Sequence, residues 1–238
     1  MERSIELRGR RITYCLERKN VKNINLRIKP GGSVYVSASR RVPERVIEDF
    51  MRRKGAYILS ALERMEKTAG GVLPPRYESG DTLLLFGGVK TLRVEQGRPM
   101  GCRLEGDVLL LTVADPNDTE QKKRVLDRWL RTELERELEE ICRGIYPAFA
   151  ERGVKYPQLR LRRMRACWGS CAVRKGAVTF NSRLSAVPRS CIEYVAVHEF
   201  THFLRPDHSP EFYRLLSGFM PDWRERKKAL AGYGYLTQ

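Results

Sequence analysis

Three histidines stand close together near the C-terminal end of this 238-residue sequence, and no other histidine occurs in it. His198 and His202 are four residues apart, so on a helix their imidazoles project from the same face. Glu199 completes the pattern His-Glu-x-x-His, in which two histidines bind zinc and the glutamate takes a proton from the metal-bound water as general base. A catalytic zinc has three protein ligands and one open position. His208 is therefore the expected third ligand.

Other polar residues near the histidines each allow two interpretations. Glu211 could approach the metal, but a glutamate at this position more often caps its own helix. Asp207 could orient an imidazole, but a turn aspartate is the favoured interpretation. The pair Cys167 and Cys171 could form a second metal site. A lone Cys-x-x-x-Cys is weak evidence, so a structural turn around Trp168 is favoured.

Short elements on both sides must position these side chains. Apolar residues alternating with arginines over 159–162 predict a strand, and 176–181 predicts the returning strand of a hairpin. Pro188 is expected to open the helix that carries His198, and Pro206 prevents its continuation. Two more helices are expected, one starting at Ser209–Pro210 and a last one over 223–230.

The preceding part of the chain has mainly the period-two pattern of strands. The expected elements are four strands before residue 38, a helix over about 43–65, a connector over 68–81, strands at 83–86, 89–94 and 109–113, and a long helix from about 119 that Pro147 kinks or ends. We therefore expect an α+β fold. It would have a basic β-rich N-terminal region over 1–114 and a zincin-like metal-hydrolase domain over 115–238.

The composition is strongly basic, with 45 lysines and arginines against 29 acidic residues and a formal charge of +16. This balance favours an anionic partner such as nucleic acid or a nucleotide, although the basic residues are spread along the chain as on any solvated surface. No apolar run approaches the roughly 20 residues that span a bilayer, so no membrane partner is expected. The N-terminus has no hydrophobic signal region, and we expect a cytoplasmic protein whose six cysteines are free thiols.

The combination of several segments resembles the YgjP-like family of metallopeptidase-domain proteins, which is related to the SprT-like minimal zincins. The segments that carry the resemblance are Val21–Ile28, Gly32, Val34–Ser37, Phe86–Gly88, Trp168–Cys171, Asn181, Arg183–Leu184, Tyr194–His202, His208–Ser209, Phe212 and Pro221–Asp222. They span almost the whole chain, and the Trp168–Cys171 turn makes the resemblance more specific than the histidine pattern alone.

The resemblance implies a minimal zincin with an active-site helix and a small sheet that has an edge strand. It implies zinc ligation by His198, His202 and His208, with Glu199 as the catalytic glutamate. The spacing of the histidines is also that of metzincins, but those carry glycine where this chain has Arg205.

One departure from the family pattern concerns the residue before the tryptophan, which is usually arginine and here is Cys167. Arg165 could take over the binding of an anion. Arg165, Trp168 and Asn181 are the candidate substrate-binding residues.

Three functions follow from these observations. The first is a zinc-dependent hydrolase of metallopeptidase type, with a peptide or protein substrate paired along an edge strand, for which 176–181 is the candidate. The second, also implied by the resemblance, is a metal-dependent nucleoside triphosphate (UTP) pyrophosphatase. The chain has no glycine-rich phosphate loop and no acidic cluster for magnesium, but its basic charge suits a triphosphate. The third is a nucleic-acid-associated protease module, by analogy with SprT-like proteins.

Overall fold

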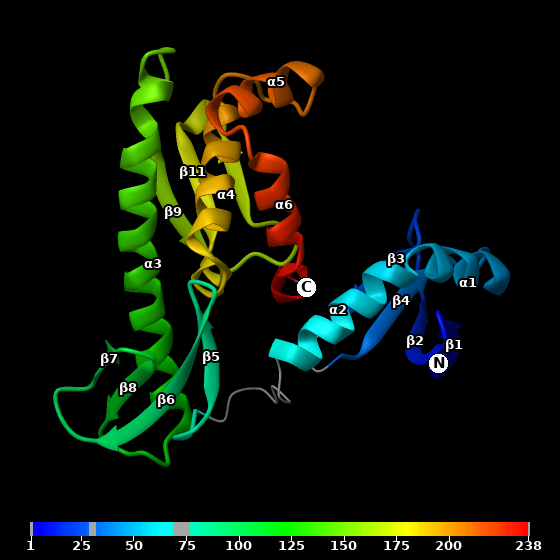
Figure 1. Ribbon diagram of the computed structural model, residues 1–238, viewed down its shortest axis with the longest axis horizontal. Helices are drawn as coiled ribbons and strands as arrows, with labels where there is room; N and C mark the ends of the chain where they lie inside the picture. Colours follow the sequence, from blue (N-terminus) through cyan, green and yellow to red (C-terminus); the bar gives the residue numbers. More distant parts are fainter. Residues whose placement is uncertain (1, 29–31, 69–76, 238) are drawn as a thin grey trace. The chain divides into compact units, whose positions relative to one another are not determined.

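Within residues 2–28, 32–68 and 77–237, which the computed structural model describes, six α-helices and three small β-sheets form a mixed α+β fold (Figure 1). The chain divides into two compact units. The first comprises Met1–Pro74 with Gly234–Leu236 and Gln238, and the second comprises Pro75–Tyr233 with Thr237.

The first unit contains a four-stranded sheet and two helices. Its strands are β1 (Glu2–Leu7), β2 (Arg10–Arg18), β3 (Asn25–Ile28) and β4 (Val34–Ala38), in the order β1-β2-β4-β3. Inward-facing residues of the strands, such as Leu16 and Val36, share one core with Ile47, Met51 and Ile58 of the helices. The alternation of buried and exposed side chains confirms the four strands expected from the sequence.

The helix expected over about 43–65 is two helices, α1 (Glu44–Arg53) and α2 (Gly55–Thr68). The break falls at Lys54, whose φ of −88° and ψ of 2° lie outside the helical range. Gly55 follows directly, and glycine is among the weakest helix formers because it loses the most backbone entropy. The apolar periodicity continues across the break, which is why the sequence pattern does not reveal it.

A second four-stranded sheet opens the second unit and packs on its longest helix. The strands β5 (Thr82–Leu85), β6 (Gly88–Gln96), β7 (Gly101–Glu105) and β8 (Val108–Val113) have the order β5-β6-β8-β7. The helix is α3 (Thr119–Ala150), which accommodates Pro147 in its last turn. Leu92, Leu109 and Leu111 share a core with Leu126 of α3. This common core places β5–β8 with the C-terminal half, so the units divide after residue 74 and not at the expected 114.

The third sheet consists of β9 (Gln158–Arg162), β10 (Gly169–Ala172) and β11 (Ala177–Asn181), in the order β10-β11-β9. The helices α4 (Arg189–Thr201), α5 (Pro210–Phe219) and α6 (Trp223–Ala231) follow. β10 and β11 form the expected antiparallel hairpin. However, β11 also pairs in parallel with β9, so it is the central strand. The prediction that residues 176–181 form the edge strand is therefore wrong. The edge strand beside β11 is β10.

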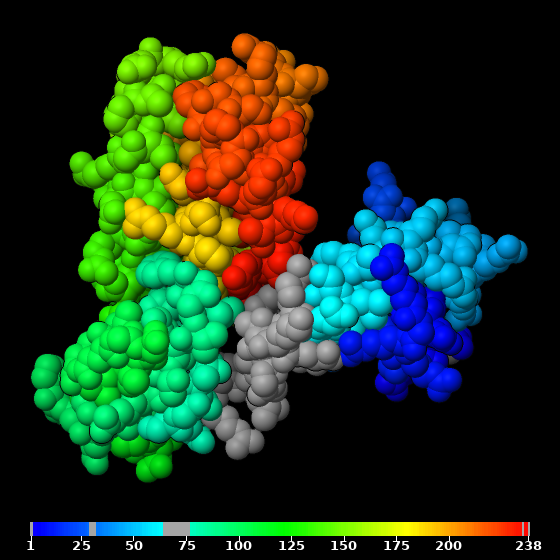
Figure 2. Space-filling view, viewed as in Figure 1, coloured from blue at the N-terminus to red at the C-terminus, as the bar shows by residue number. Residues whose placement is uncertain are grey.

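Helix α4 lies between α3 on one side and α5 and α6 on the other, all of which contact it. Figure 2 shows the surface of this unit, where α3 in green and α5 and α6 in orange to red cover much of α4. Nine of the thirteen residues of α4 are buried as a result, including Val195, Val197 and Phe200. Such a helix offers a rigid, mostly dry support for polar groups.

No helix among the described residues combines the length and the apolar character that crossing a membrane requires.

Candidate metal centre

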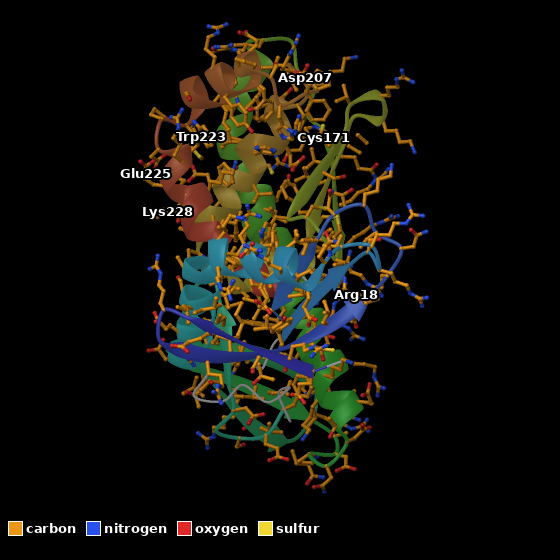
Figure 3. All side chains as sticks on the ribbon, turned by 90° about the vertical axis from the view of Figure 1, so that its right-hand side faces the viewer. Arg18, Cys171, Asp207, Trp223, Glu225 and Lys228 are labelled. Atoms are coloured by element: carbon orange, nitrogen blue, oxygen red, sulfur yellow. The ribbon has the colours of Figure 1, made fainter. Side chains whose placement is uncertain are left out.

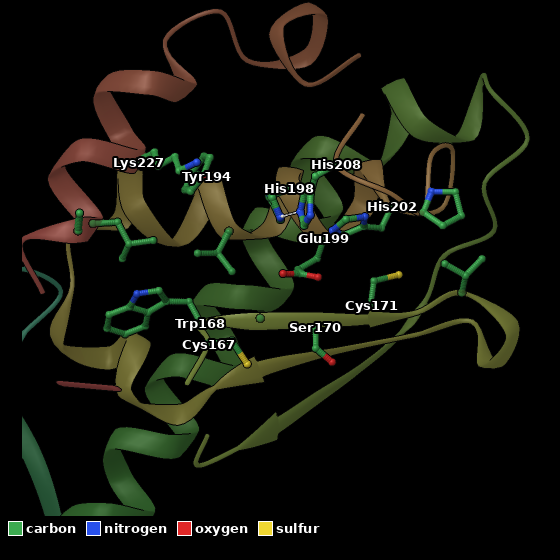
Figure 4. Close-up of a pocket in the computed structure, with 16 residues that line it drawn as sticks. Cys167, Trp168, Ser170, Cys171, Tyr194, His198, Glu199, His202, His208 and Lys227 are labelled. Atoms are coloured by element: carbon green, nitrogen blue, oxygen red, sulfur yellow. Dashed lines mark hydrogen bonds between the residues drawn. The ribbon is translucent and has the colours of Figure 1, made fainter. Parts of the chain in front are cut away.

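The histidines meet at the C-terminal end of α4 (Figure 4). Pro188 precedes the first turn of α4, and His198 and His202 lie one turn apart at its end, with His202 as the residue that terminates it. The chain then turns through Pro206 and returns, so that His208 comes back to the same place just before α5. The local signals for helix ends thus bring the three imidazoles together.

One ring nitrogen from each histidine lies within 4.8 Å of the others, and the three form a possible metal-binding group. The Nε2 atoms of His198 and His208 are only 3.0 Å apart. His202 Nδ1 lies 3.3 Å from the carbonyl oxygen of Arg205. A proton on Nδ1 makes this a hydrogen bond and leaves the lone pair of His202 Nε2 available to a metal.

The protonation of the cluster favours metal binding. Burial, together with smaller contributions from the charges of His202, His208 and Lys227, lowers the pKa of His198 to about 3. Burial also lowers the pKa of His202. Neutral imidazoles have the lone pair that a metal needs, whereas imidazolium ions do not. The three converging nitrogen donors, with His198 and His202 kept neutral by burial, therefore fit a divalent metal ion.

Phe212 of α5 packs against all three imidazoles. Its ring centroid lies 5.0 Å from that of His198, 4.7 Å from that of His202 and 4.9 Å from that of His208. Phe212 itself is fully buried. Because it contacts every member of the cluster, this single ring restricts the orientation of all three.

Glu199 occupies a narrow space between α4 and the edge strand β10. Its side chain is 5% exposed, and burial raises the pKa of its carboxyl to about 8. Gly169 of β10 provides the space: a Cβ atom there would lie 2.6 Å from Glu199 Oε1 and 2.7 Å from its Cγ. The glutamate can therefore lie beside the histidines only because residue 169 has no side chain. A cation bound by the histidines would favour its ionised form.

A cleft of about 640 Å³ opens in front of these residues. Its floor is the segment 167–171, and its remaining lining comes from α4, α6, Val173, His202, Pro206 and His208. Figure 4 shows Trp168, Tyr194 and Lys227 at one end of the cleft and Cys171 at the other, with Glu199 between them. This volume is in the range of small-molecule and peptide subsites.

Of the three candidate substrate-binding residues, only Trp168 lines the cleft. Arg165 is exposed and is not part of the lining. Asn181 is fully buried, and its Nδ2 donates to the carbonyl oxygens of Met164 and Cys167 at 2.9 and 2.8 Å. Asn181 thus supports the loop that leads to Trp168.

The alternatives for the neighbouring polar residues also have structural answers. Glu211 is bound by Arg214 through two hydrogen bonds of 2.9 and 2.7 Å, and Asp207 accepts from Arg205. Neither belongs to the histidine group. Burial raises the pKa of Cys171 to about 12, with a further contribution from Glu199. Neither Cys167 nor Cys171 belongs to a group of three possible metal ligands among the described residues.

Three contributors to the site had no role assigned from the sequence. Phe212 and Gly169 stand in segments that carry the family resemblance, but the sequence does not show that one packs on the histidines and the other makes room for Glu199. Lys227 has no sequence signal, whereas glycine inside a strand often marks the close approach of another group.

A family model described as YgjP-like, metallopeptidase domain, matches residues 22–233 of the chain. No curated protein matches it.

Proposed function

This chain belongs to the YgjP-like family of metallopeptidase-domain proteins, and on that premise we propose that it is a zinc-dependent hydrolase that cleaves peptide bonds. The observation that supports this most is the convergence of His198, His202 and His208 beside the buried Glu199. Three neutral imidazoles are a typical ligand set of catalytic zinc.

Each residue of the site has a distinct task in the proposed reaction. His198, His202 and His208 would hold the ion, and the carbonyl oxygen of Arg205, 3.3 Å from His202 Nδ1, favours the tautomer with the proton on Nδ1. When bound, zinc acts as a Lewis acid that polarises the scissile carbonyl and makes a water molecule nucleophilic at neutral pH. Glu199 accepts the proton from the attacking water and delivers it to the leaving amine.

The edge strand β10 is the proposed binding site for the peptide main chain. One side of β10 pairs with β11, and its other side carries no strand among the described residues. Unpaired backbone groups at a sheet edge accept an extended peptide as an added strand. Since Gly169 of β10 lies against Glu199, a peptide there would pass the catalytic carboxylate.

A nucleoside triphosphate is the weaker substrate candidate. Such a molecule carries about four negative charges, and proteins bind such groups with several cations or backbone N–H groups. Lys227 is the one lysine or arginine that lines the cleft in the described part of the chain. The rest of the lining is largely apolar, which suits peptide side chains better.

The proposal can be tested with Glu199→Gln and the matched variant Glu211→Gln. Both remove one carboxylate near the histidines, but Glu211 pairs with Arg214 on the surface. Metal content is measured by mass spectrometry. Peptide cleavage is measured with a proteome-derived peptide library, and pyrophosphate release is measured with UTP as substrate. We expect both variants to keep one zinc per chain. Glu199→Gln should lose about 10²- to 10⁴-fold of peptide cleavage, and Glu211→Gln should match the native protein.

Unimpaired cleavage by Glu199→Gln would refute the role of Glu199. If the protein releases pyrophosphate from UTP and cleaves no peptide, the proposed peptidase function is wrong and the nucleotide hydrolase is the function.

A further inference from the structure

The end of the cleft on the side of α6 combines an apolar wall with an uncompensated positive charge. Tyr194 and Val195 lie one helical turn before His198 and Glu199, so the four share a face of α4. Leu230 and Ala231 lie one turn after Lys227 on α6, and all of them line the cleft. Trp168 closes this end from the opposite side (Figure 4).

Aromatic rings hold the ammonium group of Lys227 in place. Its Nζ lies 5.6 Å from the ring centroid of Trp223 and 5.9 Å from that of Tyr213. These two rings stack on each other at 5.3 Å, and the ring of Tyr213 lies 6.3 Å from that of His208. A row of rings therefore connects the metal ligand to the lysine, and cation–π attraction favours this position of the charge.

Four acidic side chains in and beside helices α4, α5 and α6 are paired with arginines. Glu193 and Asp222 both bind Arg226, Glu211 binds Arg214, and Asp207 binds Arg205. The remaining acid of α6, Glu225, is two residues before Lys227 and projects from another side of the helix. Figure 3 shows Glu225 on the outer side of α6, away from Cys171 on β10. Lys227 forms no ion pair with any described residue.

From this arrangement we infer that the cleft selects peptides that present a carboxylate to Lys227 next to an apolar side chain that lies against Trp168 and Tyr194. The inference rests on the proposed peptidase function and adds its substrate class. The apolar wall contributes affinity by removing the side chain from water, and Lys227 contributes selectivity by charge. The carboxylate can belong to an aspartate or glutamate side chain or to the C-terminus of the peptide.

The test compares Lys227→Glu and Lys227→Met with Lys228→Glu. Lys228 is the next residue of α6, is exposed and does not line the cleft, so its variant changes the net charge equally without touching the site. The zinc-loaded full-length proteins are incubated with a proteome-derived peptide library, and the cleavage sites are read by mass spectrometry. Selected peptides are then assayed with an acidic, a neutral or a basic residue at the position concerned, each with a free and an amidated C-terminus.

The native protein should cleave peptides with an acidic group at one fixed position, next to an apolar residue. Lys227→Glu should reduce kcat/KM for these peptides by about 10- to 100-fold and shift the preference to basic residues. Lys227→Met should remove the charge preference and keep the apolar one. If only amidation of the peptide C-terminus abolishes cleavage, the terminal carboxylate is the recognised group. If replacement of the acidic residue by a neutral one abolishes cleavage, the recognised group is an aspartate or glutamate side chain.

A further measurement separates this inference from the proposed function. Peptide binding is measured with the zinc-loaded Glu199→Gln protein, with and without Lys227→Glu. Binding of acidic peptides that depends on Lys227, without cleavage by the native protein, would retain the subsite and refute the peptidase. Cleavage without charge preference, or an equal effect of Lys228→Glu, would overturn the subsite and leave the peptidase standing. Absence of any peptide binding would overturn both.

Discussion

Gly169 and Glu199 pack closely against each other. The glutamate side chain fills the space that a side chain at position 169 would occupy. The carboxylate proposed as the general base is thus positioned by the space that Gly169 leaves free, as well as by its place on α4. Close packing of this kind transmits small changes directly to the reacting group.

We expect Gly169→Ala to impair catalysis while the metal stays bound. The added Cβ would approach Glu199 Oε1 to 2.6 Å, so β10 or the glutamate must move. A displacement of about 1 Å of a catalytic group can cost about 100-fold in rate. Peptide cleavage and zinc content of the variant are the measurements.

Gly144→Ala is the control for this variant. It makes the same substitution on α3, where a Cβ meets no atom within 4 Å. We expect full activity and slightly higher stability from the better helix former. Wild-type activity in Gly169→Ala would show that the contact with Glu199 is not needed.

At the scale of elements, the hairpin of β5 and β6 supports the start of α4, the helix that carries His198 and Glu199. Phe86 N donates to the carbonyl oxygen of Ser185 at 2.7 Å, in the 3₁₀ turn Ser182–Ala186 before α4. Phe86 and Gly87 have positive φ values of 47° and 83°. Gly87 lies against Pro188, the residue that precedes α4.

We expect Gly87→Ala to destabilise the protein through two effects. Its Cβ would lie 2.7 Å from Pro188 Cγ, and its φ of 83° is unfavourable for alanine. Gly106→Ala isolates the second effect, because Gly106 has a φ of 60° and no atom within 4 Å of an added Cβ. The conformational cost is about 1–2 kcal/mol, and the overlap with Pro188 adds about 1–3 kcal/mol.

Denaturant unfolding of both variants measures the difference. Equal losses of unfolding free energy in Gly87→Ala and Gly106→Ala would show that the hairpin tip does not support α4.

At the scale of the whole molecule, the two units should respond differently to metal. All three histidines and all three tryptophans belong to residues 75–233. We expect zinc to stabilise this unit, by about 2.7 kcal/mol at a free concentration 100 times its Kd. Tryptophan fluorescence should therefore show a higher Tm with zinc than with a chelator.

Amide hydrogen exchange in β1–β4 provides the comparison for the first unit. Its protection should not change with metal, since residues 1–74 contain no histidine. Equal changes in both units would mean that they unfold as one cooperative body.

The charge of the molecule is concentrated in the first unit. Residues 1–74 contain 17 lysines and arginines against 8 acids, which is +9 of the total +16. We expect the full-length protein to bind duplex DNA or RNA with a log Kd that rises steeply with log salt concentration. Arg27→Glu and Arg45→Glu together should weaken this binding, and the exposed pair Arg131→Glu and Arg143→Glu on α3 is the control. If the affinity for nucleic acid does not depend on salt concentration, the first unit does not bind it through an electrostatic surface.

The sequence by itself predicted that the three histidines form a metal site, and it indicated most of the short elements around them. His198, Glu199 and His202 share a helix, and Pro188, Pro206 and Ser209–Pro210 set the ends of α4 and the start of α5 through local backbone restrictions. Local rules suffice there, because helix geometry fixes the relation between residues a turn apart.

The tertiary structure decided the features that depend on contacts between segments far apart in the chain. In the structure, β11 lies at the centre of its sheet and β10 at the edge, and the two units divide after residue 74. Asn181, expected to bind substrate, instead holds the loop that leads to Trp168 through its hydrogen bond to the carbonyl oxygen of Cys167. Strand order and shared cores arise from contacts between segments far apart in the chain, and a hydrophobic period reveals only that a strand has a buried face, not which neighbour covers it.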